Sequence, residues 1–206
     1  MLLKIHPENP QKRHLDTVIE CLKNGGIIIY PTDTIYGIGC DIYNKKAVER
    51  ICRIKGLDPK KANLSFICED LSHLSTFARN LSNPTFRILK AALPGPYTFI
   101  LPASKETPKI IQSKKDTVGL RVPDHIISQE IVRKLGNPLM STSLPMQDEE
   151  HVSYYTDPEI IYDLFHKQVD IIIDSGIGNM TPSTVVDCTQ DEPQLIRQGQ
   201  GEWPIL

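Results

Sequence analysis

Residues 25–40 constrain the fold of this chain more than any other stretch. They begin with Gly25-Gly26, a suitable end for a preceding helix, and continue with Ile27-Ile28-Ile29-Tyr30. These four residues have the high β propensity that a fully buried strand requires. Pro31 then ends the strand, because it has no N–H to give to a neighbouring strand. The stretch therefore predicts a central buried strand.

A dense polar cluster follows this strand. Thr32, Asp33 and Thr34 supply two hydroxyls and a carboxylate. Gly37 and Gly39 then allow the backbone to approach a ligand closely. Ligands of α/β sheets bind just beyond the carboxyl ends of strands. A tight polar turn between two core strands is the alternative interpretation, but the density of polar residues between apolar runs favours a ligand-facing role.

The composition is that of a globular protein. The 206 residues are 40% hydrophobic and 23% charged, which suffices for one sizeable core. Apolar runs such as Ile27–Tyr30 are too short to cross a bilayer, and residues 1–7 lack the features of a signal peptide. The five cysteines are an odd number without a pair at metal-binding spacing, so we expect free thiols and a cytoplasmic location. A monomer without membrane contact is the default expectation.

The net charge of −2 conceals an asymmetry along the chain. Residues 1–146 carry 21 Lys+Arg against 13 Asp+Glu, a balance of +8, whereas residues 147–206 carry 2 against 12, a balance of −10. Basic clusters of this kind attract anionic partners such as nucleotides or RNA. Solvated helix faces explain most charge runs equally well, so the charge alone does not decide the function.

Strands and helices alternate along the chain. Helices are predicted over residues 11–24, 45–54, 70–78, 84–93, 126–135 and 157–167. Further strands are predicted over residues 64–68, 97–101, 117–122, 138–143, 169–174 and 184–188, and a surface loop over residues 144–156. The alternation predicts a single three-layer α/β domain over residues 1–206, built on a mixed sheet.

Several familiar motifs are absent from the sequence. There is no Walker A loop, no G-x-S-x-G elbow and no H-E-x-x-H pair, and Gly37-Ile38-Gly39 lacks the third glycine of a dinucleotide fingerprint. The six histidines show no metal-ligand spacing. The sequence therefore predicts no protein-bound metal.

Hydroxyls and cations recur instead where predicted strands and helices begin or end. They are Thr32, Thr34, Lys55, Thr117, Arg121, Ser141, Thr142, Ser143, Ser183, Thr184 and Arg197. Such groups suit phosphate and carboxylate oxygens, because they donate hydrogen bonds without having to titrate. A reaction that needs alignment and charge neutralisation more than a strong base fits this equipment, and phosphoryl or adenylyl transfer is of that type.

At these positions the chain resembles the YrdC/YciO family. Through Ile5-His6-Pro7-Glu8-Asn9-Pro10 and Glu49-Arg50-Ile51-Cys52-Arg53-Ile54 it most resembles the YciO branch. The matching motifs run in order along the chain: Tyr30-Pro31-Thr32-Asp33-Thr34-Ile35-Tyr36-Gly37, Lys55-Gly56, Pro94-Gly95-Pro96-Tyr97-Thr98, Gly119-Leu120-Arg121-Val122-Pro123, Pro182-Ser183-Thr184-Val185-Val186-Asp187 and Ile196-Arg197-Gln198-Gly199. The resemblance implies one α/β domain with a twisted mixed sheet and a large basic groove.

The resemblance also implies a function. Enzymes of the family join L-threonine, bicarbonate or carbon dioxide, and ATP into threonylcarbamoyl-AMP and pyrophosphate, for the modification of adenosine in certain tRNAs. Family members are also described as binding double-stranded RNA and tRNA. ATP is expected to arrive with Mg²⁺, which holds phosphate oxygens without a protein metal cage.

Site residues are implied by position. Those on the threonine side are Thr32, Arg121 and Ser183. Those on the nucleotide side are Lys55, Thr117, Ser141 and Arg197. No residue is assigned as catalytic.

Two departures from the synthase motifs put the activity in question. The synthases carry Lys-x-Arg and Ser-x-Asn, whereas here Leu57 and Ser143 occupy the last position of each. Leucine cannot replace a planar, permanently charged donor group, although Lys60 or Lys61 is a candidate to substitute for it in space.

Three hypotheses follow. The first is a nucleotide-binding, RNA-associated protein with weak or altered threonylcarbamoyl-AMP synthesis. The second is a non-catalytic module that binds double-stranded RNA or tRNA. The third is a different small-molecule ligase or hydrolase on the same fold.

Overall fold

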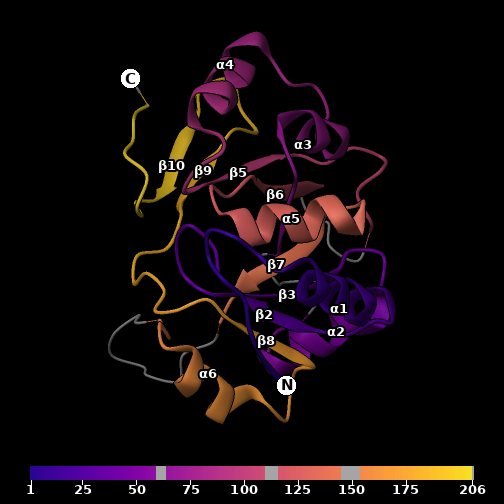
Figure 1. Cartoon of the computed structure of the whole chain (residues 1–206). Coiled ribbons are helices and arrows are strands. Elements are labelled where there is room, and N and C mark those ends of the chain that lie inside the picture. Colours follow the sequence, from indigo (N-terminus) through magenta and orange to yellow (C-terminus); the bar gives the residue numbers. More distant parts are fainter. Residues whose placement is uncertain (59–63, 110–115, 145–153, 206) are drawn as a thin grey trace.

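The computed structural model describes residues 1–58, 64–109, 116–144 and 154–205, and a ten-stranded sheet runs through them (Figure 1). The strands are β1 (Leu2–Lys4), β2 (Ile28–Tyr30), β3 (Gly37–Asp41), β4 (Ser65–Ile67), β5 (Tyr97–Pro102), β6 (Thr117–Arg121), β7 (Leu139–Ser143), β8 (Ile171–Asp174), β9 (Thr184–Asp187) and β10 (Gln194–Arg197). The helices are α1 (Lys12–Lys23), α2 (Lys45–Ile54), α3 (Leu71–Phe77), α4 (Asn83–Ala92), α5 (Ile126–Leu135) and α6 (Pro158–Phe165).

The sheet mixes parallel and antiparallel pairs. Its strand order is β1-β8-β2-β3-β7-β4-β6-β5-β9-β10. The pairs β1–β8, β2–β8, β4–β6 and β5–β9 are parallel, and the other five are antiparallel. The amino terminus therefore lies at one edge of the sheet and the carboxyl-terminal strand at the other (Figure 1). This architecture confirms the predicted single α/β domain with a mixed sheet.

Helices cover the sheet from both sides, as the alternation of side chains along each strand requires. On one face α1 and α5 pack together over Ile28, Ile67 and Leu139. On the other face α2, α3, α4 and α6 share a larger core with strand residues such as Phe66 and Met140. These two residues are the sequence neighbours of Ile67 and Leu139, so their side chains point to the opposite face. Successive residues of β4 and of β7 therefore pack against the helices on opposite faces of the sheet.

The helix ends follow from local sequence. Asn44, Asp70, Ser82 and Asp157 each accept a hydrogen bond from a backbone N–H of the first turn that follows them. Gly136 follows the last residue of α5 with a φ of 80°, a conformation that favours glycine. These signals explain why the six predicted helices are all observed, to within a few residues.

Three strands were not predicted. The short edge strands β1 and β10 lack the buried, β-branched pattern on which the prediction depends; all four residues of β10 are exposed. The third is β3, which contains Gly37 and Gly39, residues of low β propensity. Both glycines were predicted to let the backbone approach a ligand. Gly39 instead allows the backbone of the neighbouring strand β7 to come close, since a Cβ at this position would lie 2.6 Å from the Met140 carbonyl oxygen.

The acidic part of the sequence is not a separate region of the molecule. Residues 154–205 contribute β8, between β1 and β2, and β9 and β10 at the far edge of the same sheet. The uneven charge along the sequence therefore does not translate into an acidic tail. Most of the predicted loop at residues 144–156 lies outside the described residues, as do Lys60 and Lys61.

The cysteines behave as small apolar residues. All five are free thiols, and Cys40, Cys52, Cys68 and Cys188 are buried. Within the described ranges, no helix combines the length and apolarity that a bilayer span requires.

The close packing of β3 against β7 yields a stability prediction. We expect Gly39→Ala to lower the free energy of unfolding by about 2 to 3 kcal/mol, because the new methyl group meets the Met140 carbonyl. Gly37→Ala in the same strand is the control: its Cβ would lie 3.3 Å from its nearest neighbours, so the loss is expected to be about 1 kcal/mol. Urea unfolding measures both, and equal losses would contradict the explanation.

Candidate functional site

A cavity opens on the sheet where the layer of α1 and α5 ends. Ile67 pairs with Leu139, and both pack under these helices. Ser65 pairs with Ser141, and each lies two residues from the Ile67–Leu139 pair in its own strand. Because side chains two residues apart in a strand point to the same face, both serines lie on the face of these helices, where they line the cavity. The sheet itself therefore forms the floor of the site.

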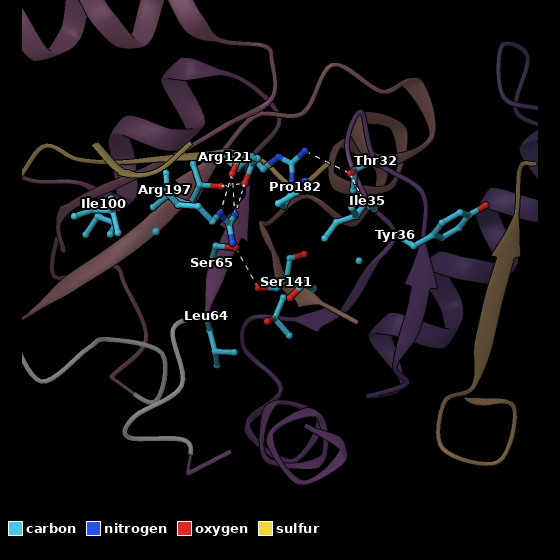
Figure 2. A pocket seen from close by; sticks show the side chains of 18 of the residues that line it. Thr32, Ile35, Tyr36, Leu64, Ser65, Ile100, Arg121, Ser141, Pro182 and Arg197 are labelled. Carbon is cyan, nitrogen blue, oxygen red and sulfur yellow. Dashed lines mark hydrogen bonds between the residues drawn. The ribbon is translucent and has the colours of Figure 1, made fainter. Parts of the chain in front are cut away.

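The cavity has a volume of about 360 Å³, within the size range of small-molecule sites. Eight serine or threonine side chains line it, together with Arg121 and Arg197 (Figure 2). None of its lining residues within the described ranges is an aspartate or glutamate. The lining is therefore rich in hydrogen-bond donors and positively charged.

Arg121 is fixed by the turn that follows β2. Its Nη2 donates to the Asp33 carboxylate and to Thr34 Oγ1, the latter at 2.7 Å. Both members of the Arg121–Asp33 ion pair have side chains only 9% exposed. Asp124 N donates to the second oxygen of Asp33 at 3.0 Å, so both carboxylate oxygens are satisfied. The turn after β2 thereby holds the Arg121 guanidinium group at the cavity wall, and the backbone of Asp124 in turn holds the Asp33 carboxylate.

Thr32 lines the cavity beside Arg121, but its hydroxyl serves the turn. Thr32 Oγ1 donates its single proton to the Ile35 carbonyl at 2.7 Å and accepts from Thr34 N at 3.1 Å. It also lies 3.4 Å from Arg121 Nη2. Hydrogen-bond donation on the predicted threonine side must therefore come from other residues.

A second loop holds the same turn from outside. Asn179 Nδ2 donates to the Asp33 carbonyl at 3.0 Å, and Asn179 N donates to the Thr34 carbonyl at 3.3 Å. Nearby, Tyr36 Oη donates to the Gly176 carbonyl at 2.8 Å. The residues between β8 and β9 therefore hold the polar turn in place.

The far wall of the cavity comes from β5, β9 and β10. Ser183 Oγ lies 2.9 Å from Thr98 Oγ1, and Arg197 Nη2 donates to the Ser183 carbonyl at 2.8 Å. The pairing of β10 with β9 shifts register between Leu195 and Arg197, which marks a bulge. As a result Ile196 and Arg197 both line the cavity, although successive residues of a regular strand point to opposite faces.

Lys55 reaches the cavity from the end of α2. Its Nζ donates to Thr142 Oγ1 at 3.1 Å, to the Ser143 carbonyl at 2.7 Å and to Ser143 Oγ at 3.3 Å. Thr142 and Ser143 line the cavity, whereas Lys55 stands behind them. Burial lowers the pKa of the Lys55 amine below its usual value.

Leu57 belongs to the termination of α2. Gly56 has a φ of 63°, its N–H donates to the Arg53 carbonyl, and Leu57 N donates to the Cys52 carbonyl at 2.8 Å. This is the Schellman arrangement, which favours an apolar residue at the position of Leu57. Leu57 is not among the residues that line the cavity, so the departure from Lys-x-Arg has a local structural explanation.

Six of the seven predicted site residues line this one cavity: Thr32, Thr117, Arg121, Ser141, Ser183 and Arg197. The seventh, Lys55, touches it through Thr142 and Ser143. Sequence reasoning assigned no role to Ser65 and Thr98, which also line it. The sequence could have indicated Thr98, because it stands in a matching family motif. It gave no indication of Ser65, which merely precedes an apolar pair in β4.

The arrangement suits anion binding. Within the described ranges, no group of three or more His, Cys, Asp or Glu side chains is placed to hold a metal ion. The cavity offers hydroxyls and guanidinium groups, which match phosphate and carboxylate oxygens.

Comparison with known proteins identifies relatives along the whole chain. The sequence profile Sua5_yciO_yrdC, described as "Telomere recombination", matches residues 20–199. The chain is 45% identical over 199 residues to the protein YciO of Escherichia coli (strain K12), an alignment that covers 96% of this chain and 95% of that one. It is 32% identical over 189 residues to the threonylcarbamoyl-AMP synthase of Vibrio vulnificus (strain YJ016), which covers 90% of this chain and 98% of that one.

Solved structures share the fold. The crystal structure of E. coli YciO has a TM-score of 0.92 and 42% identity, covering 100% of this chain and 99% of the other. The crystal structure of P. abyssi Sua5 complexed with L-threonine has a TM-score of 0.84 and 25% identity, covering 97% of this chain and 57% of that longer one. These likenesses confirm the resemblance that the motifs predicted.

The Asp33–Arg121 pair yields a second prediction. Asp33→Asn is expected to lower the free energy of unfolding by about 3 kcal/mol, because it leaves a buried guanidinium without its counter-charge. Glu49→Gln is the matched control, since Glu49 and Lys45 form an exposed pair at 3.8 Å worth less than about 0.5 kcal/mol. Denaturant unfolding measures both. A loss for Asp33→Asn as small as the control would contradict the assigned role of the pair.

His125, next to this pair, yields a prediction of pH dependence. Its Nδ1 is buried and has no hydrogen-bond partner among the described residues. Burial lowers its pKa below the usual 6.5, and Arg121 acts in the same direction, against the opposing effect of Asp33 and Asp124. The unfolded chain therefore binds more protons than the folded one as the pH falls from about 7 through 6.5, so stability decreases in this window. We expect the stability of His125→Gln to fall less over this window than that of the wild type, and parallel pH profiles would contradict this.

Proposed function

Because the chain belongs to the Sua5/YciO/YrdC family, we propose that its cavity binds ATP, carried with Mg²⁺, together with L-threonine. The protein makes threonylcarbamoyl-AMP slowly or catalyses an altered version of this synthesis. It acts in association with RNA and serves tRNA modification. Homology to the 32% identical synthase supports the reaction. The P. abyssi relative complexed with L-threonine supports the amino acid as a ligand.

The observation that carries this proposal is the lining of the cavity. Its described residues combine a buried arginine, a second arginine at the far wall and eight hydroxyl side chains, and none of them carries a carboxylate. These groups remain donors across the physiological pH range. Carboxylate and phosphate oxygens of a ligand match such groups, whereas a cationic ligand would face two guanidinium groups.

On the threonine side, Arg121 and Ser183 supply donors for the carboxylate and hydroxyl of the amino acid. Arg121 is suited to this because Asp33 and Thr34 hold its guanidinium in place before the ligand arrives. Such preorganisation means that little side-chain entropy is lost on binding. Thr32 shapes the turn rather than donating.

On the nucleotide side, Arg197, Ser141 and Thr117 hold phosphate oxygens, with Lys55 behind them. The amine of threonine takes up carbon dioxide as a carbamate, whose oxygen attacks the α-phosphorus of ATP. The bond from this phosphorus to the bridging oxygen breaks, and pyrophosphate leaves. The protein contributes alignment and charge neutralisation, which are the main demands of such a transfer.

Leu57 explains why the proposed activity is weak. The synthases carry an arginine at this position, and the loss of one donor to a developing negative charge costs roughly a hundredfold or more in rate. Leu57→Arg restores the motif and is expected to raise the rate of pyrophosphate release.

The test is calorimetric titration of ATP–Mg²⁺ into the protein, with and without L-threonine and bicarbonate, followed by an assay for pyrophosphate. We expect ATP binding and slow pyrophosphate release that depends on threonine. Arg197→Gln should weaken ATP binding about tenfold or more, because it removes a charge-assisted hydrogen bond. Arg133→Gln, which removes an exposed arginine paired with Glu130 outside the cavity, is the control.

Two outcomes would redirect the proposal. ATP binding with pyrophosphate release that does not depend on threonine would point to the adenylylation of a different acyl group on the same fold. Absence of ATP binding, together with RNA binding that weakens steeply with salt, would overturn the proposal in favour of an RNA-binding module.

A further inference from the structure

Residues 175–183, which we call the β8–β9 loop, contain one side chain that binds the backbone of the polar turn after β2. Asn179 Nδ2 donates to the Asp33 carbonyl at 3.0 Å, and Asn179 N donates to the Thr34 carbonyl at 3.3 Å. A carbonyl oxygen only accepts hydrogen bonds, so the amide nitrogen of Asn179 faces the turn. Asn179 is itself exposed and does not line the cavity.

Hydrogen bonds account for much of the attachment of this loop. Its two large apolar side chains, Ile177 and Met180, are 72% and 68% exposed, so burial of their surface contributes little. Tyr36 Oη donates to the Gly176 carbonyl at 2.8 Å, which adds one polar contact between the loop and the start of β3. The position of the loop against the turn therefore depends on a small set of hydrogen bonds, and Asn179 supplies two of them.

Asn179 connects two groups that face the ligand from different segments of the chain. The β8–β9 loop ends in Ser183, which is buried and lines the far wall of the cavity. The turn that Asn179 holds carries the Asp33 carboxylate and Thr34 Oγ1, and both accept hydrogen bonds from Arg121. Arg121 and Ser183 are the two donors proposed for the carboxylate and hydroxyl of threonine. Their separation therefore depends on how the loop lies against the turn.

We propose that Asn179 is a positioning residue that fixes Arg121 relative to Ser183, and thereby sets the affinity of the cavity for its amino-acid ligand without touching that ligand. The inference rests on the proposed function and adds a residue to its threonine side. Sequence analysis assigned Asn179 no role, because it precedes the matching motif that begins at Pro182.

A positioning role and a purely structural role make different predictions. An exposed asparagine that served only the fold would change stability and leave ligand affinity as it was. An asparagine that aligns two donors changes the affinity for the ligand that both donors contact, because small displacements of such groups weaken binding. A ligand held by other residues is then unaffected.

The experiment measures the binding of L-threonine and of ATP–Mg²⁺ by calorimetry. Asn179→Ala is expected to weaken L-threonine binding by about three- to tenfold, the net effect of losing one hydrogen bond. ATP–Mg²⁺ binding should stay unchanged, because the recorded hydrogen bonds of Asn179 go to the turn and not to the nucleotide side. In threonine-dependent pyrophosphate release, the variant should raise KM for threonine and leave kcat nearly unchanged, as expected when substrate and transition state lose the same binding energy.

Asn137→Ala is the matched control. Asn137 Nδ2 donates to the Asp41 carboxylate at 2.9 Å, and neither residue lines the cavity. The control variant removes the same type of side-chain amide and should leave L-threonine binding unchanged, whatever stability it loses. Asn179→Asp keeps the shape of the side chain but has no donor for the Asp33 carbonyl, so it should weaken L-threonine binding at least as much as Asn179→Ala.

Gly178→Ala displaces the same loop and leaves Asn179 in place. A Cβ at Gly178 would lie 2.7 Å from the Tyr36 ring, so the added methyl group forces the loop and the ring apart. L-Threonine binding should weaken in this variant too, and ATP–Mg²⁺ binding should not. Gly178→Ala therefore tests the inference if Asn179→Ala does not fold.

A further readout needs no ligand. The Nε–H group of Arg121 is buried and has no hydrogen-bond partner among the described residues. NMR relaxation of this N–H group reports how firmly the guanidinium is held. We expect greater motion of the group in Asn179→Ala than in the wild type or in Asn137→Ala.

The outcomes separate this inference from the proposed function. L-Threonine binding that is equal in the wild type and Asn179→Ala overturns the inference and leaves the proposed function standing. Equal weakening of L-threonine and ATP–Mg²⁺ binding also overturns it, because a disturbed fold then explains both. If the wild type binds no L-threonine, the proposed function is overturned. Greater motion of Arg121 in Asn179→Ala then still supports the positioning role, and unchanged motion overturns the two together.

Discussion

The buried ion pair between Asp33 and Arg121 is the interaction on which the site depends. It joins the turn after β2 to the last residue of β6, 88 positions further along the chain. Removing two charges from water is costly, so such a pair persists only where other hydrogen bonds complete it. Thr34 and the N–H of Asp124 do so here. The pair therefore contributes a defined guanidinium position more than it contributes stability.

The floor of the site is a continuation of the sheet rather than a set of loops. Along β6, Val118 and Leu120 are buried in the core under the helices, while Thr117, Gly119 and Arg121 alternate with them and face the cavity. The same strand thus holds the fold together and presents the ligand groups. Side chains fixed in this way are held more rigidly than side chains on mobile connections, which suits a site that acts by alignment.

The sequence was informative where structure is local and less so where it depends on distant partners. Capping residues and apolar periodicity predicted the helices. Hydroxyls and cations near strand ends, together with the family motifs, pointed to four hydroxyl residues and two arginines that line one cavity, because strand ends converge at the same region of the sheet. The strand β3 escaped prediction because its glycines are explained only by Tyr30 and Met140, which the fold brings against them. Likewise, the bulge that turns both Ile196 and Arg197 toward the cavity arises from pairing with β9, not from β10 itself.

The two departures from the synthase motifs differ in kind: Leu57 lacks both the charge and the donors of an arginine, whereas Ser143 keeps a polar side chain. Leu57 completes the termination of α2, and Ser143 supplies two of the three oxygens that hold Lys55. Ser141, Thr142 and Ser143 of β7 line the cavity, and Tyr30 donates a hydrogen bond to Ser141. Orientation of a phosphate-bearing ligand depends on such donors, whereas the rate of transfer depends on fixed charge near the reacting phosphorus. Under the proposed function, a chain with an apolar helix stop in place of this guanidinium is expected to bind the ligand but to carry out the transfer slowly.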